Sequence, residues 1–377
     1  MTDVFLTGIG MTHFAKLEGV SEGALVREAV DLAIKDAALE PESIDAVFLG
    51  NVFGAGGLGQ IVMAASPLAG KPITNVENAC ASSSSAMLEG IAWIKAGFAR
   101  RVLVIGVEVL TGRFGGLLPI AAADPYSRQG MTLPALYALK ARDHMEKYGT
   151  TPEQFASVAV KNRRHGALNP NARFQTPTTV EEVLASRPIA DPITMLQCCP
   201  NSDGAAAAVL VAEDLVTDSR AIRVAGSALG SGKRRADIGW DEATLRDTAR
   251  QAYALAGVTA ADVHLGEVHD AFAPGELFAY ERLGFSEPGE GGPDVESGRF
   301  TLGGSGPTVN SSGGLIARGH PLGATGIAQI HEIVTQLRGE AGDRQVVGAE
   351  VGVAVTMGGS VPQLETNACA VHVLTTR

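Results

Sequence analysis

The pattern of hydrophobic and polar positions predicts an α/β protein. Short apolar runs of strand length lie at 4–10, 46–50, 72–76 and 102–106, and longer runs with helical spacing separate them. In the run at 86–94 the apolar residues would share one face of a helix, namely Ala86, Met87, Leu88, Ile91, Trp93 and Ile94. Strands that alternate with helices are typical of layered α/β folds.

The same succession of patterns returns in the second half of the chain. Two similar α/β halves, 1–220 and 221–377, would bring equivalent loops to their shared boundary when they pack together. The turn that follows the run at 72–76 then matches the glycine-rich loop before a helix-like run at 325–337. The other matched runs are 4–10 with 222–228, 23–39 with 241–256, 46–50 with 263–266, and 102–106 with 351–355.

A segment at about 111–193 breaks this repeat and is predicted to be a loop domain inserted in the first half. It is rich in Gly, Pro, Arg and Ala, and it contains a long helical run at 135–148. Local positive charge suits a phosphate-bearing ligand, although a solvated helix face would explain the same charges. The basic residues are Lys140, Arg142, Lys147, Lys161, Arg163 and Arg164.

Composition narrows the class of protein. The chain has 377 residues, of which 45% are hydrophobic and 19% charged, so it can bury a large core in two domains. Its net charge of −11 argues against nucleic-acid binding, which requires a basic face. No apolar run approaches 20 residues and no secretory signal is evident, so we expect neither a membrane span nor export. The four cysteines have no metal-ligand spacing, which favours a reducing, cytoplasmic compartment and no metal.

Cys80 is the first candidate catalytic residue. It lies where the strand-like run at 72–76 gives way to a helix-like run, so unpaired N–H groups and the helix dipole would favour its thiolate. The small residues that follow Cys80 would leave room for a substrate. The alternative for an unpaired cysteine is a buried structural role.

Two histidines are further candidates. His320 stands in the glycine-rich loop 310–326, and Pro321 fixes the chain immediately after it. A lone histidine is usually a packed or surface residue, but one held by Gly-His-Pro in a glycine-rich loop is more typical of a catalytic residue. His269 follows the strand-like run at 263–266, where α/β proteins bind ligands, although a strand-end histidine often makes only local hydrogen bonds.

These segments resemble the thiolase family over nearly the whole chain. The Asn-Ala-Cys-Ala-Ser stretch around Cys80 is similar to the nucleophile segment of the family, and 319–326 is similar to its Gly-His-Pro block. The stretch 202–207 is similar to its Asp-Gly-Ala-Ala block. His-Asp-Ala-Phe at 269–272 resembles the sterol-carrier-protein and archaeal types, since other members carry Asn-Glu-Ala-Phe there.

The resemblance implies a fold and a set of roles. The fold would be two duplicated halves in a five-layer α-β-α-β-α sandwich, with the inserted domain covering acyl-CoA. Cys80 would take the acyl group, His320 would act as the base, and His269 would bind an oxyanion. The backbone of Gly358 and Gly359 would form a second oxyanion site. Substrate contacts would come from Ser227, Gly319 and Phe272.

The resemblance also implies partners. Coenzyme A or acyl-CoA would be a substrate, with no tightly bound cofactor. Thiolases form dimers or tetramers through the sheet edge after the nucleophile helix, for which 101–109 is the candidate strand. Relatives of the archaeal type bind a small OB-fold, zinc-ribbon protein, so the resemblance admits such a partner.

The sequence departs from the family at the second catalytic cysteine. Thr356 stands where many thiolases carry that cysteine, and Ala271 stands where sterol-carrier types often carry one. We interpret Cys369 as a core residue and Cys198 and Cys199 as structural. The expectation is therefore a poor acetoacetyl-CoA thiolase that still acylates Cys80.

The function predicted from the sequence is a thiolase-like acyltransferase of lipid metabolism. It would condense acyl groups through carbon–carbon bonds or cleave 3-oxoacyl-CoA by thiolysis. The alternatives are acyl transfer to a non-CoA carbon or heteroatom acceptor, retro-aldol cleavage, and a non-catalytic acyl-CoA or lipid carrier. Neither chain length nor reaction direction follows from the sequence.

Overall fold

The computed structural model describes residues 2–119, 125–234, 243–359 and 364–376. Residues 241 and 242 of the predicted helix at 241–256 lie outside this range, and so do residues 361–363, which follow the predicted oxyanion glycines.

The first half of the chain forms a mixed sheet with the order β3-β2-β4-β7-β1. Strands β2, β3 and β4 are parallel to one another, and β7 runs antiparallel to both β4 and β1. Every residue of β7 is buried, as expected for a central strand whose sequence is one continuous apolar run. The elements are β1 (Val4–Met11), α1 (Glu22–Asp36), β2 (Ala46–Gly50), α2 (Leu58–Met63), β3 (Ile73–Val76), α3 (Ser82–Ala96), β4 (Arg101–Glu108) and β7 (Gly204–Ala212).

The second half repeats this topology strand for strand. Its order is β10-β9-β11-β12-β8, with the same parallel and antiparallel pairs, so the duplication predicted from the sequence is confirmed. The elements are β8 (Ile222–Ser231), α8 (Ala243–Ala256), β9 (Leu265–Glu267), α9 (Ala273–Arg282), α10 (Gly291–Glu296), β10 (Thr308–Val309), α11 (Gly314–Arg318), α12 (Thr325–Leu337), β11 (Val351–Gly358) and β12 (Ala368–Thr375).

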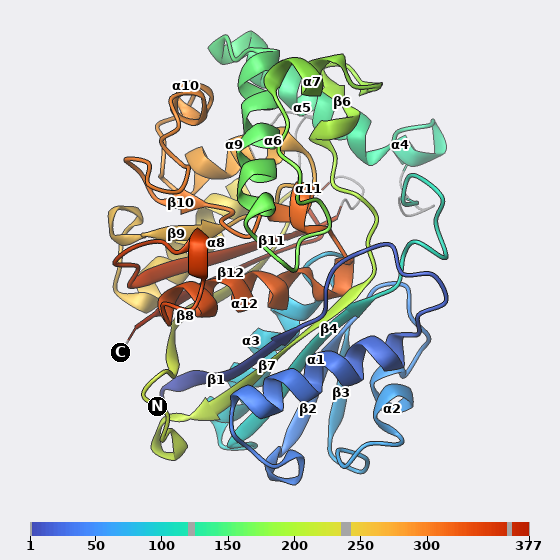
Figure 1. The fold of residues 1–377 in the computed structure, drawn as a ribbon, viewed down its shortest axis with the longest axis vertical. Helices are drawn as coiled ribbons and strands as arrows, with labels where there is room; N and C mark the ends of the chain where they lie inside the picture. Colours follow the sequence, from blue (N-terminus) through green and yellow to red (C-terminus); the bar gives the residue numbers. More distant parts are fainter. Residues whose placement is uncertain (1, 120–124, 235–242, 360–363, 377) are drawn as a thin grey trace.

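The two halves stack as five layers. Helix α1 covers one sheet and α8 covers the other, while α3 and α12 lie side by side between the sheets (Figure 1). The five-layer sandwich is therefore confirmed. The two sheets also meet edge to edge, because Phe5 pairs with Arg223 and Leu6 with Ile222, so all ten strands form one continuous hydrogen-bonded sheet.

Small residues let the two central helices approach closely. Ser82, Ser83, Ser84 and Ser85 of α3 are all buried. A Cβ added to Gly326 of α12 would lie 2.1 Å from Ser84 Oγ and 2.7 Å from its backbone nitrogen. The small residues after Cys80 thus serve helix packing rather than leaving room for a substrate, which corrects the expectation from the sequence.

The segment between β4 and β7 forms the part of the molecule above the sheets in Figure 1. Its helix α5 confirms the predicted helical run and begins two residues earlier. The limits of this insertion and of the two halves stay predictions. The elements are α4 (Pro125–Arg128), α5 (Leu133–Tyr148), α6 (Pro152–Ala167), α7 (Val180–Ala185), β5 (Pro188–Ala190) and β6 (Ile193–Thr194).

Six short 3₁₀ helices among the described residues complete the connections. They are η1 (Pro41–Ser43), η2 (Met195–Gln197), η3 (Glu213–Leu215), η4 (Ala260–Asp262), η5 (Leu322–Ala324) and η6 (Gly342–Arg344). Within the described parts of the chain, no helix has the length and apolar character needed to span a bilayer.

The predicted edge strand is wrong. Strand β4, at 101–108, pairs with β2 on one side and β7 on the other, so it offers no free edge. The edge of the first half is β3, which pairs with β2 alone and has two exposed residues, Thr74 and Asn75. A local apolar pattern predicts a strand but does not give its place in the sheet.

Candidate active site

A strained turn presents Cys80. Strand β3 ends at Val76 and α3 begins at Ser82, so the thiol lies at the strand-to-helix junction, as predicted. Ala79 has a φ of 49°, a left-handed conformation that is uncommon for a residue with a Cβ. Its N–H donates to Glu77 Oε1 at 2.7 Å, and the N–H of Asn78 donates to Ser82 Oγ at 3.0 Å. These bonds hold the turn in shape just before Cys80.

The structure brings Cys80, His269 and His320 together. The cysteine sulfur and one nitrogen of each ring lie within 4.8 Å of one another. The two rings meet edge to face, with centroids 5.1 Å apart and an interplanar angle of 80°. Cys80 comes from the first half and both histidines from the second, so the cluster forms where the halves meet.

The hydrogen bonds of His320 identify its basic nitrogen. Its Nδ1 lies 2.7 Å from Thr325 Oγ1, and the single hydroxyl proton of Thr325 is donated to the Pro321 carbonyl at 2.9 Å. We infer that Nδ1 donates to Thr325, because that hydroxyl can only accept a second bond. Nε2 of the neutral ring is then the proton acceptor.

Gly319 fixes the backbone before this histidine. Its φ is 108°, a conformation that favours glycine, and an added Cβ would lie 2.8 Å from Ser202 Oγ. The glycine is thus explained by packing, and its predicted contact with substrate stays a prediction.

Burial dominates the ionisation of Cys80. It raises the pKa of the thiol to about 12, and the negative charge of Glu108 adds to this rise. The backbone N–H groups of Gly359 and of Cys80 itself lower the pKa of the thiol and offset part of the effect. The expectation that the helix N-terminus favours thiolate is therefore wrong for the free protein, since desolvation outweighs it. Cys80 needs a base before it can attack.

Both histidines are neutral near pH 7. Burial, and then the charge of Arg318, lowers the pKa of His269 to about 3. Burial also lowers the pKa of His320 well below its usual range, and the charges of His269 and Arg318 add to this effect. His269 is 5% exposed, and its Nδ1 has no hydrogen-bond partner among the described residues. A buried, unpartnered ring nitrogen beside a thiol is suited to bind an atom of a substrate.

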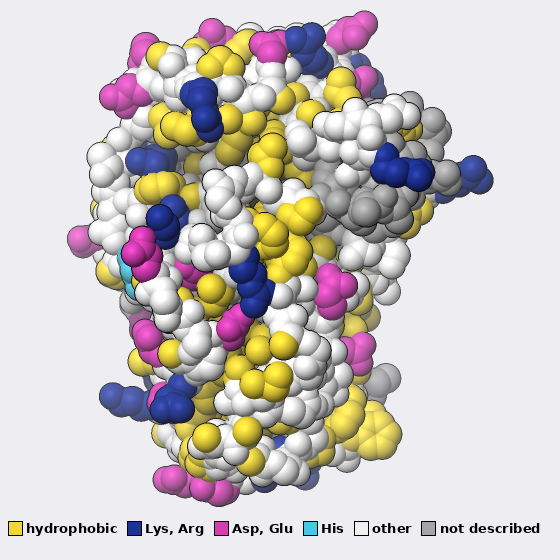
Figure 2. Space-filling view, turned by 90° about the vertical axis from the view of Figure 1, so that its right-hand side faces the viewer, with side chains coloured by type: hydrophobic (Ala, Val, Ile, Leu, Met, Phe, Trp, Pro, Cys, Tyr) yellow, Lys and Arg dark blue, Asp and Glu magenta, His cyan; other side chains and the backbone are white. Residues whose placement is uncertain are grey.

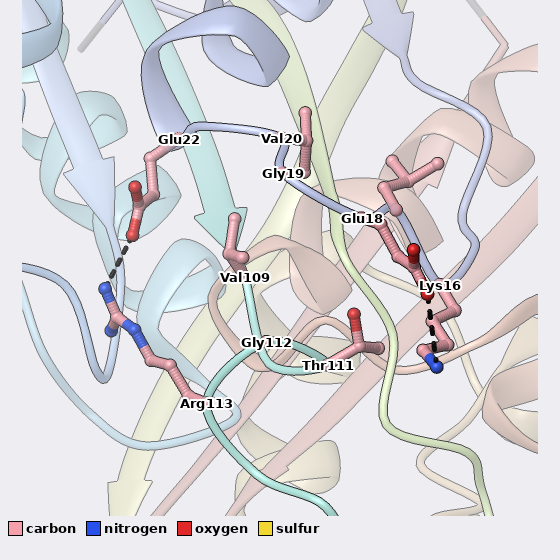
Figure 3. Close-up of a pocket in the computed structure, with 10 residues that line it drawn as sticks. Lys16, Glu18, Gly19, Val20, Glu22, Val109, Thr111, Gly112 and Arg113 are labelled. Carbon is pink, nitrogen blue, oxygen red and sulfur yellow. Dashed lines mark hydrogen bonds and ion pairs between the residues drawn. The ribbon is translucent and has the colours of Figure 1, made fainter.

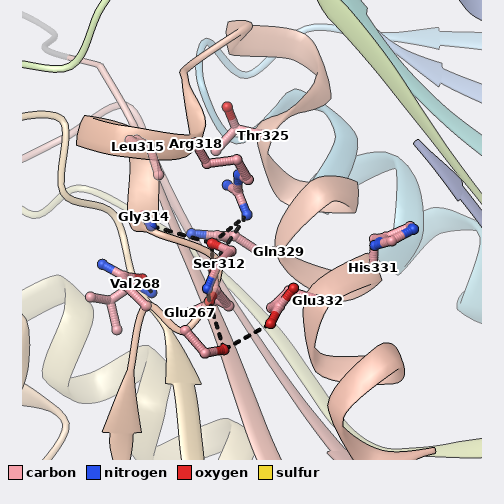
Figure 4. Close-up of polar contacts among 12 residues, drawn as sticks. Glu267, Val268, Ser312, Gly314, Leu315, Arg318, Thr325, Gln329, His331 and Glu332 are labelled. Atoms are coloured by element: carbon pink, nitrogen blue, oxygen red, sulfur yellow. Dashed lines mark hydrogen bonds and ion pairs between the residues drawn. The ribbon is translucent and has the colours of Figure 1, made fainter. Parts of the chain in front are cut away.

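A buried polar network joins the segment after β9 to the segment around α11 and to α12 (Figure 4). Arg318 pairs with Glu267 at 3.2 Å, and its Nη1 lies at the same distance from the hydroxyl of Ser312. Glu332 in turn accepts from Ser311 at 3.0 Å and pairs with Arg344 at 3.1 Å. Because these charges are nearly inaccessible to water, the network holds the backbone between β9 and α12 in a fixed position.

Glu108 is a site residue that sequence reasoning missed. Its carboxylate accepts from the N–H groups of Val52, Phe53 and Gly323, and burial raises its pKa to about 7. It thereby joins the loops after β2 and before α12 to the end of β4. Only its place at the end of a predicted strand signalled it in the sequence.

The other predicted residues divide into two groups. The backbone N–H of Gly359 lowers the pKa of the Cys80 thiol, and Gly358 lies against the same turn, where an added Cβ would be 2.4 Å from the Asn78 carbonyl. Phe272 packs on Tyr137 of the inserted segment, with ring centroids 4.8 Å apart. Ser227 hydrogen-bonds His372 at 2.7 Å instead, and no described contact joins it to the cluster.

The basic residues of the insertion are not all accessible. Lys161 is buried, forms an ion pair with Glu276 at 2.8 Å and donates to the Val309 carbonyl. Lys140 is also buried. Figure 2 shows Lys and Arg side chains scattered over one face rather than gathered in a patch. These two lysines therefore do not offer an exposed charge to a phosphate.

A separate hollow of about 500 Å³ lies between the β1–α1 loop and the segment after β4 (Figure 3). Arg113 and Glu22 form an ion pair at 2.7 Å across it. None of Cys80, His269 and His320 lines this hollow. It is therefore distinct from the cysteine–histidine cluster.

The cluster has the donor atoms of a zinc site as well as those of a nucleophile. One thiol and two imidazoles within 4.8 Å are a usual partial ligand set for zinc. The sequence predicted no metal, and that stays a prediction. The strained turn, and the backbone N–H groups that lower the pKa of the thiol, fit a nucleophilic cysteine better than a zinc ligand.

Two family models match most of the chain. The model described as "Thiolase, N-terminal domain" matches residues 4–214, and "Thiolase C-terminal domain-like" matches residues 230–371. Acetyl-CoA acetyltransferase of Methanothermobacter thermautotrophicus is 43% identical over 96% of this chain and 97% of its own. Sterol carrier protein 2 of Oryctolagus cuniculus is 38% identical over 94% of this chain and 70% of its own.

Solved structures agree with this likeness. The Ltp2-ChsH2(DUF35) aldolase has a TM-score of 0.87 at 27% identity, and the match covers 100% of this chain and 98% of the other. Human mitochondrial 3-ketoacyl-CoA thiolase in complex with CoA has a TM-score of 0.75 at 20% identity, with coverage of 100% and 98%. At 20% identity, the second match supports the fold alone.

Proposed function

This chain belongs to the thiolase family and is a thiolase-like acyltransferase, and we propose that Cys80 is the residue that carries the acyl group. The observation that supports this most is the meeting of Cys80, His269 and His320 within 4.8 Å at a strained turn. Retention of all three argues against a non-catalytic carrier on the same fold.

Acylation begins with the proton of Cys80. His320 accepts it at Nε2 as the sulfur attacks the thioester carbonyl of acyl-CoA, because Nδ1 is already bonded to Thr325. Coenzyme A leaves and takes the proton from His320. The thiol pKa of about 12 means that this transfer accompanies attack rather than precedes it.

The oxyanion formed in this step needs donors that are already in place. The backbone N–H groups of Cys80 and Gly359 stabilise negative charge at the sulfur, which supports them as donors to the carbonyl oxygen on the adjacent carbon. His269 supplies the donor for the thioester oxygen of the acyl-CoA whose C2 takes part in the carbon–carbon step. Its buried Nδ1, which has no hydrogen-bond partner among the described residues, supports this role.

The acyl enzyme then serves one of two reactions. It condenses with a carbon nucleophile, or it is formed by cleavage of a 3-oxoacyl-CoA and passes its acyl group to coenzyme A. The likeness to an acetyl-CoA acetyltransferase supports a short acyl chain. Transfer to a non-CoA acceptor would use the same first step.

Retro-aldol cleavage is the second candidate function. It is supported by the likeness to the Ltp2-ChsH2(DUF35) aldolase. That reaction needs a base for a hydroxyl proton and no acyl enzyme, so a β-hydroxyacyl-CoA would be cleaved with Cys80 replaced by Ser. Loss of cleavage in that variant would leave acyl transfer as the function.

The partners of the protein are proposals as well. The exposed edge of β3 supports a two-fold dimer in which two copies of this strand pair. The DUF35 component named with the aldolase supports a small accessory protein, such as the OB-fold, zinc-ribbon partner that the resemblance admits. Four cysteines without a disulfide support a cytoplasmic location.

Rapid mixing with acetyl-CoA tests the proposed function. We expect a burst of free coenzyme A close to one equivalent per chain, followed by slow turnover. Cys80→Ser should abolish the burst, and His320→Ala should slow it by roughly 10²–10⁴. Cys369→Ser, at a thiol buried in β12, should leave it unchanged. A full burst in Cys80→Ser would refute acyl transfer through Cys80.

A further inference from the structure

A second thiol lies beside the site. The N–H of Cys199 donates to the carbonyl of Ala271 at 3.0 Å, which places it against the loop that carries His269. Cys198 forms a β-bridge with Phe272 on the same loop, and Asn201 forms one with His320. The segment 198–201 therefore runs between the two loops that present the histidines.

Cys199 differs from a core cysteine in its surroundings. It is half-buried, as is Cys80, whereas Cys369 is completely buried. Burial raises the pKa of the Cys199 thiol well above its usual range, and the charges of Cys198, Asp270 and Cys80 add to the rise. The thiol is therefore protonated near pH 7.

Carbon–carbon bond cleavage must deliver a proton to C2 of the leaving acyl-CoA. In acylation by acetyl-CoA, His320 returns the Cys80 proton to the leaving sulfur. In cleavage the leaving atom is a carbon, and a separate donor beside it lets His320 keep the Cys80 proton until the Cys80 sulfur leaves the acyl group. Thr356 is fully buried and its hydroxyl is hydrogen-bonded to Ser84, so it is not placed to provide one.

We propose that Cys199 is the acid and base for the carbon-bound proton, an inference that rests on the proposed acyl transfer through Cys80. In cleavage, the Cys80 sulfur attacks C3 of a 3-oxoacyl-CoA and its proton passes to His320. The C2–C3 bond breaks, and C2 takes the electron pair and then the proton of Cys199.

The second half of the reaction restores both thiols. The Cys199 thiolate removes the proton of an incoming coenzyme A, whose sulfur attacks the acyl group on Cys80. The Cys80 sulfur leaves with its bonding pair and takes back the proton from His320. Condensation is the reverse, in which the Cys199 thiolate removes a proton from C2 of an acyl-CoA.

His269 gives this assignment a second support from the structure. The buried Nδ1 of His269 has no hydrogen-bond partner among the described residues. His269 lies two residues before Ala271, whose carbonyl accepts the backbone hydrogen bond of Cys199. A thioester oxygen bound by His269 would place C2 of the same acyl-CoA beside the loop to which the backbone of Cys199 is bonded. The enolate oxygen and the enolate carbon would then each have a donor.

The test compares Cys199→Ser and Cys199→Ala with Cys198→Ser. The control is an adjacent thiol that donates to the Thr194 carbonyl at 3.4 Å and makes no contact with Ala271 among the interactions described. Two readouts are followed: the burst of coenzyme A from acetyl-CoA, and the cleavage of acetoacetyl-CoA by coenzyme A. Exchange of the acetyl-CoA methyl protons in D₂O gives a third, independent readout.

Both Cys199 variants should acylate Cys80 within about threefold of the wild-type rate. Their cleavage of acetoacetyl-CoA and their proton exchange should fall by roughly 10²–10⁴, the usual contribution of a general acid or base. Cys198→Ser should retain both. Cleavage and exchange within threefold of wild type in the Cys199 variants, with the burst intact, would overturn this inference alone. Absence of a burst in the wild-type protein would overturn the proposed function itself.

Discussion

At the scale of single residues, the site keeps its nucleophile protonated until substrate arrives. Burial and Glu108 raise the pKa of Cys80 to about 12, while burial keeps His320 neutral. A neutral imidazole beside a neutral thiol is ready to transfer one proton when the thioester carbonyl approaches. Such a site resists oxidation and alkylation in its resting state, because the thiolate is the reactive form.

This account predicts the pH dependence of Cys80 alkylation. His320 supports a pH-independent rate of iodoacetamide alkylation near neutral pH. Above that rate, alkylation should rise about tenfold per pH unit up to pH 10 without a plateau, because raising the pH deprotonates a thiol whose pKa is about 12. At pH 8 it should be roughly 10²-fold below that of a thiol with a pKa of about 8.5. Mass measurement of the Cys80 peptide gives the rate. A plateau between pH 8 and 9 would show that the surroundings do not suppress ionisation.

The two histidines should have separable effects. His320→Ala removes the base and should slow alkylation of Cys80 near neutral pH. His269→Ala should leave alkylation nearly intact and lower turnover by roughly 10²–10³, the cost of losing one oxyanion donor. The alkylation rate and kcat are measured on both variants. Equal loss of alkylation in the two would contradict the division.

Motifs predicted the central cluster but not its neighbours. Cys80, His269 and His320 each stand in a local pattern that is readable from the sequence. Glu108 and Cys199 do not, because their roles depend on contacts with loops more than 70 residues away, at Gly323 and Ala271. Ser227 shows the reverse error, since its hydroxyl is already bonded to His372.

At the scale of elements, the site depends on how closely α3 and α12 approach. Cys80 precedes α3 and His320 precedes α12, so the spacing of the two helices sets the spacing of the two side chains. Gly326 and the run of serines in α3 allow the backbones to meet. The sequence showed these small residues, but a pattern of small residues does not reveal what packs against them.

Gly326→Ala tests this dependence. The added Cβ would fall 2.7 Å from the backbone nitrogen of Ser84, which cannot move independently of α3. We expect a loss of about 1–3 kcal/mol in the free energy of unfolding, the usual cost of overpacking, together with a smaller burst from acetyl-CoA. Urea unfolding and rapid mixing measure the two effects.

Gly23→Ala is the matched control, because Gly23 also lies in a helix but an added Cβ would come no closer than 4.0 Å to Ser21 Oγ. It should be neutral or stabilise by up to about 1 kcal/mol, since alanine favours helix. If Gly326→Ala behaved like this control, close packing of α3 on α12 would not position the site.

At the scale of the whole molecule, the duplication explains why a site forms between the halves. Each half presents the loop before its central helix, and the pseudo-symmetric packing brings the two loops together. The sequence predicted the duplication because apolar runs and glycine turns recur locally. The sequence predicted the wrong edge strand because strand order depends on long-range pairing, which a local pattern does not contain.

A dimer through β3 follows from the observed strand order. Light scattering should give twice the chain mass of 38.9 kDa. Thr74→Lys should shift the protein toward monomer, because lysine on an edge strand opposes pairing of two edges. Thr217→Lys, at an exposed threonine between η3 and β8, should leave the dimer intact. A dimer of unchanged stability in Thr74→Lys would place the interface elsewhere.

The central claim is that Cys80 carries the acyl group, and peptide mapping after acetyl-CoA treatment tests it most directly. The reaction is quenched in acid before the burst of coenzyme A ends, and the protein is digested. Each peptide that contains one of the four cysteines is then examined by mass spectrometry for an added acetyl group. The account predicts the label on Cys80, with greater accumulation in Cys199→Ala when acetyl-CoA is the sole substrate. An acetyl group found on Cys198, Cys199 or Cys369 while Cys80 stays unmodified would contradict it.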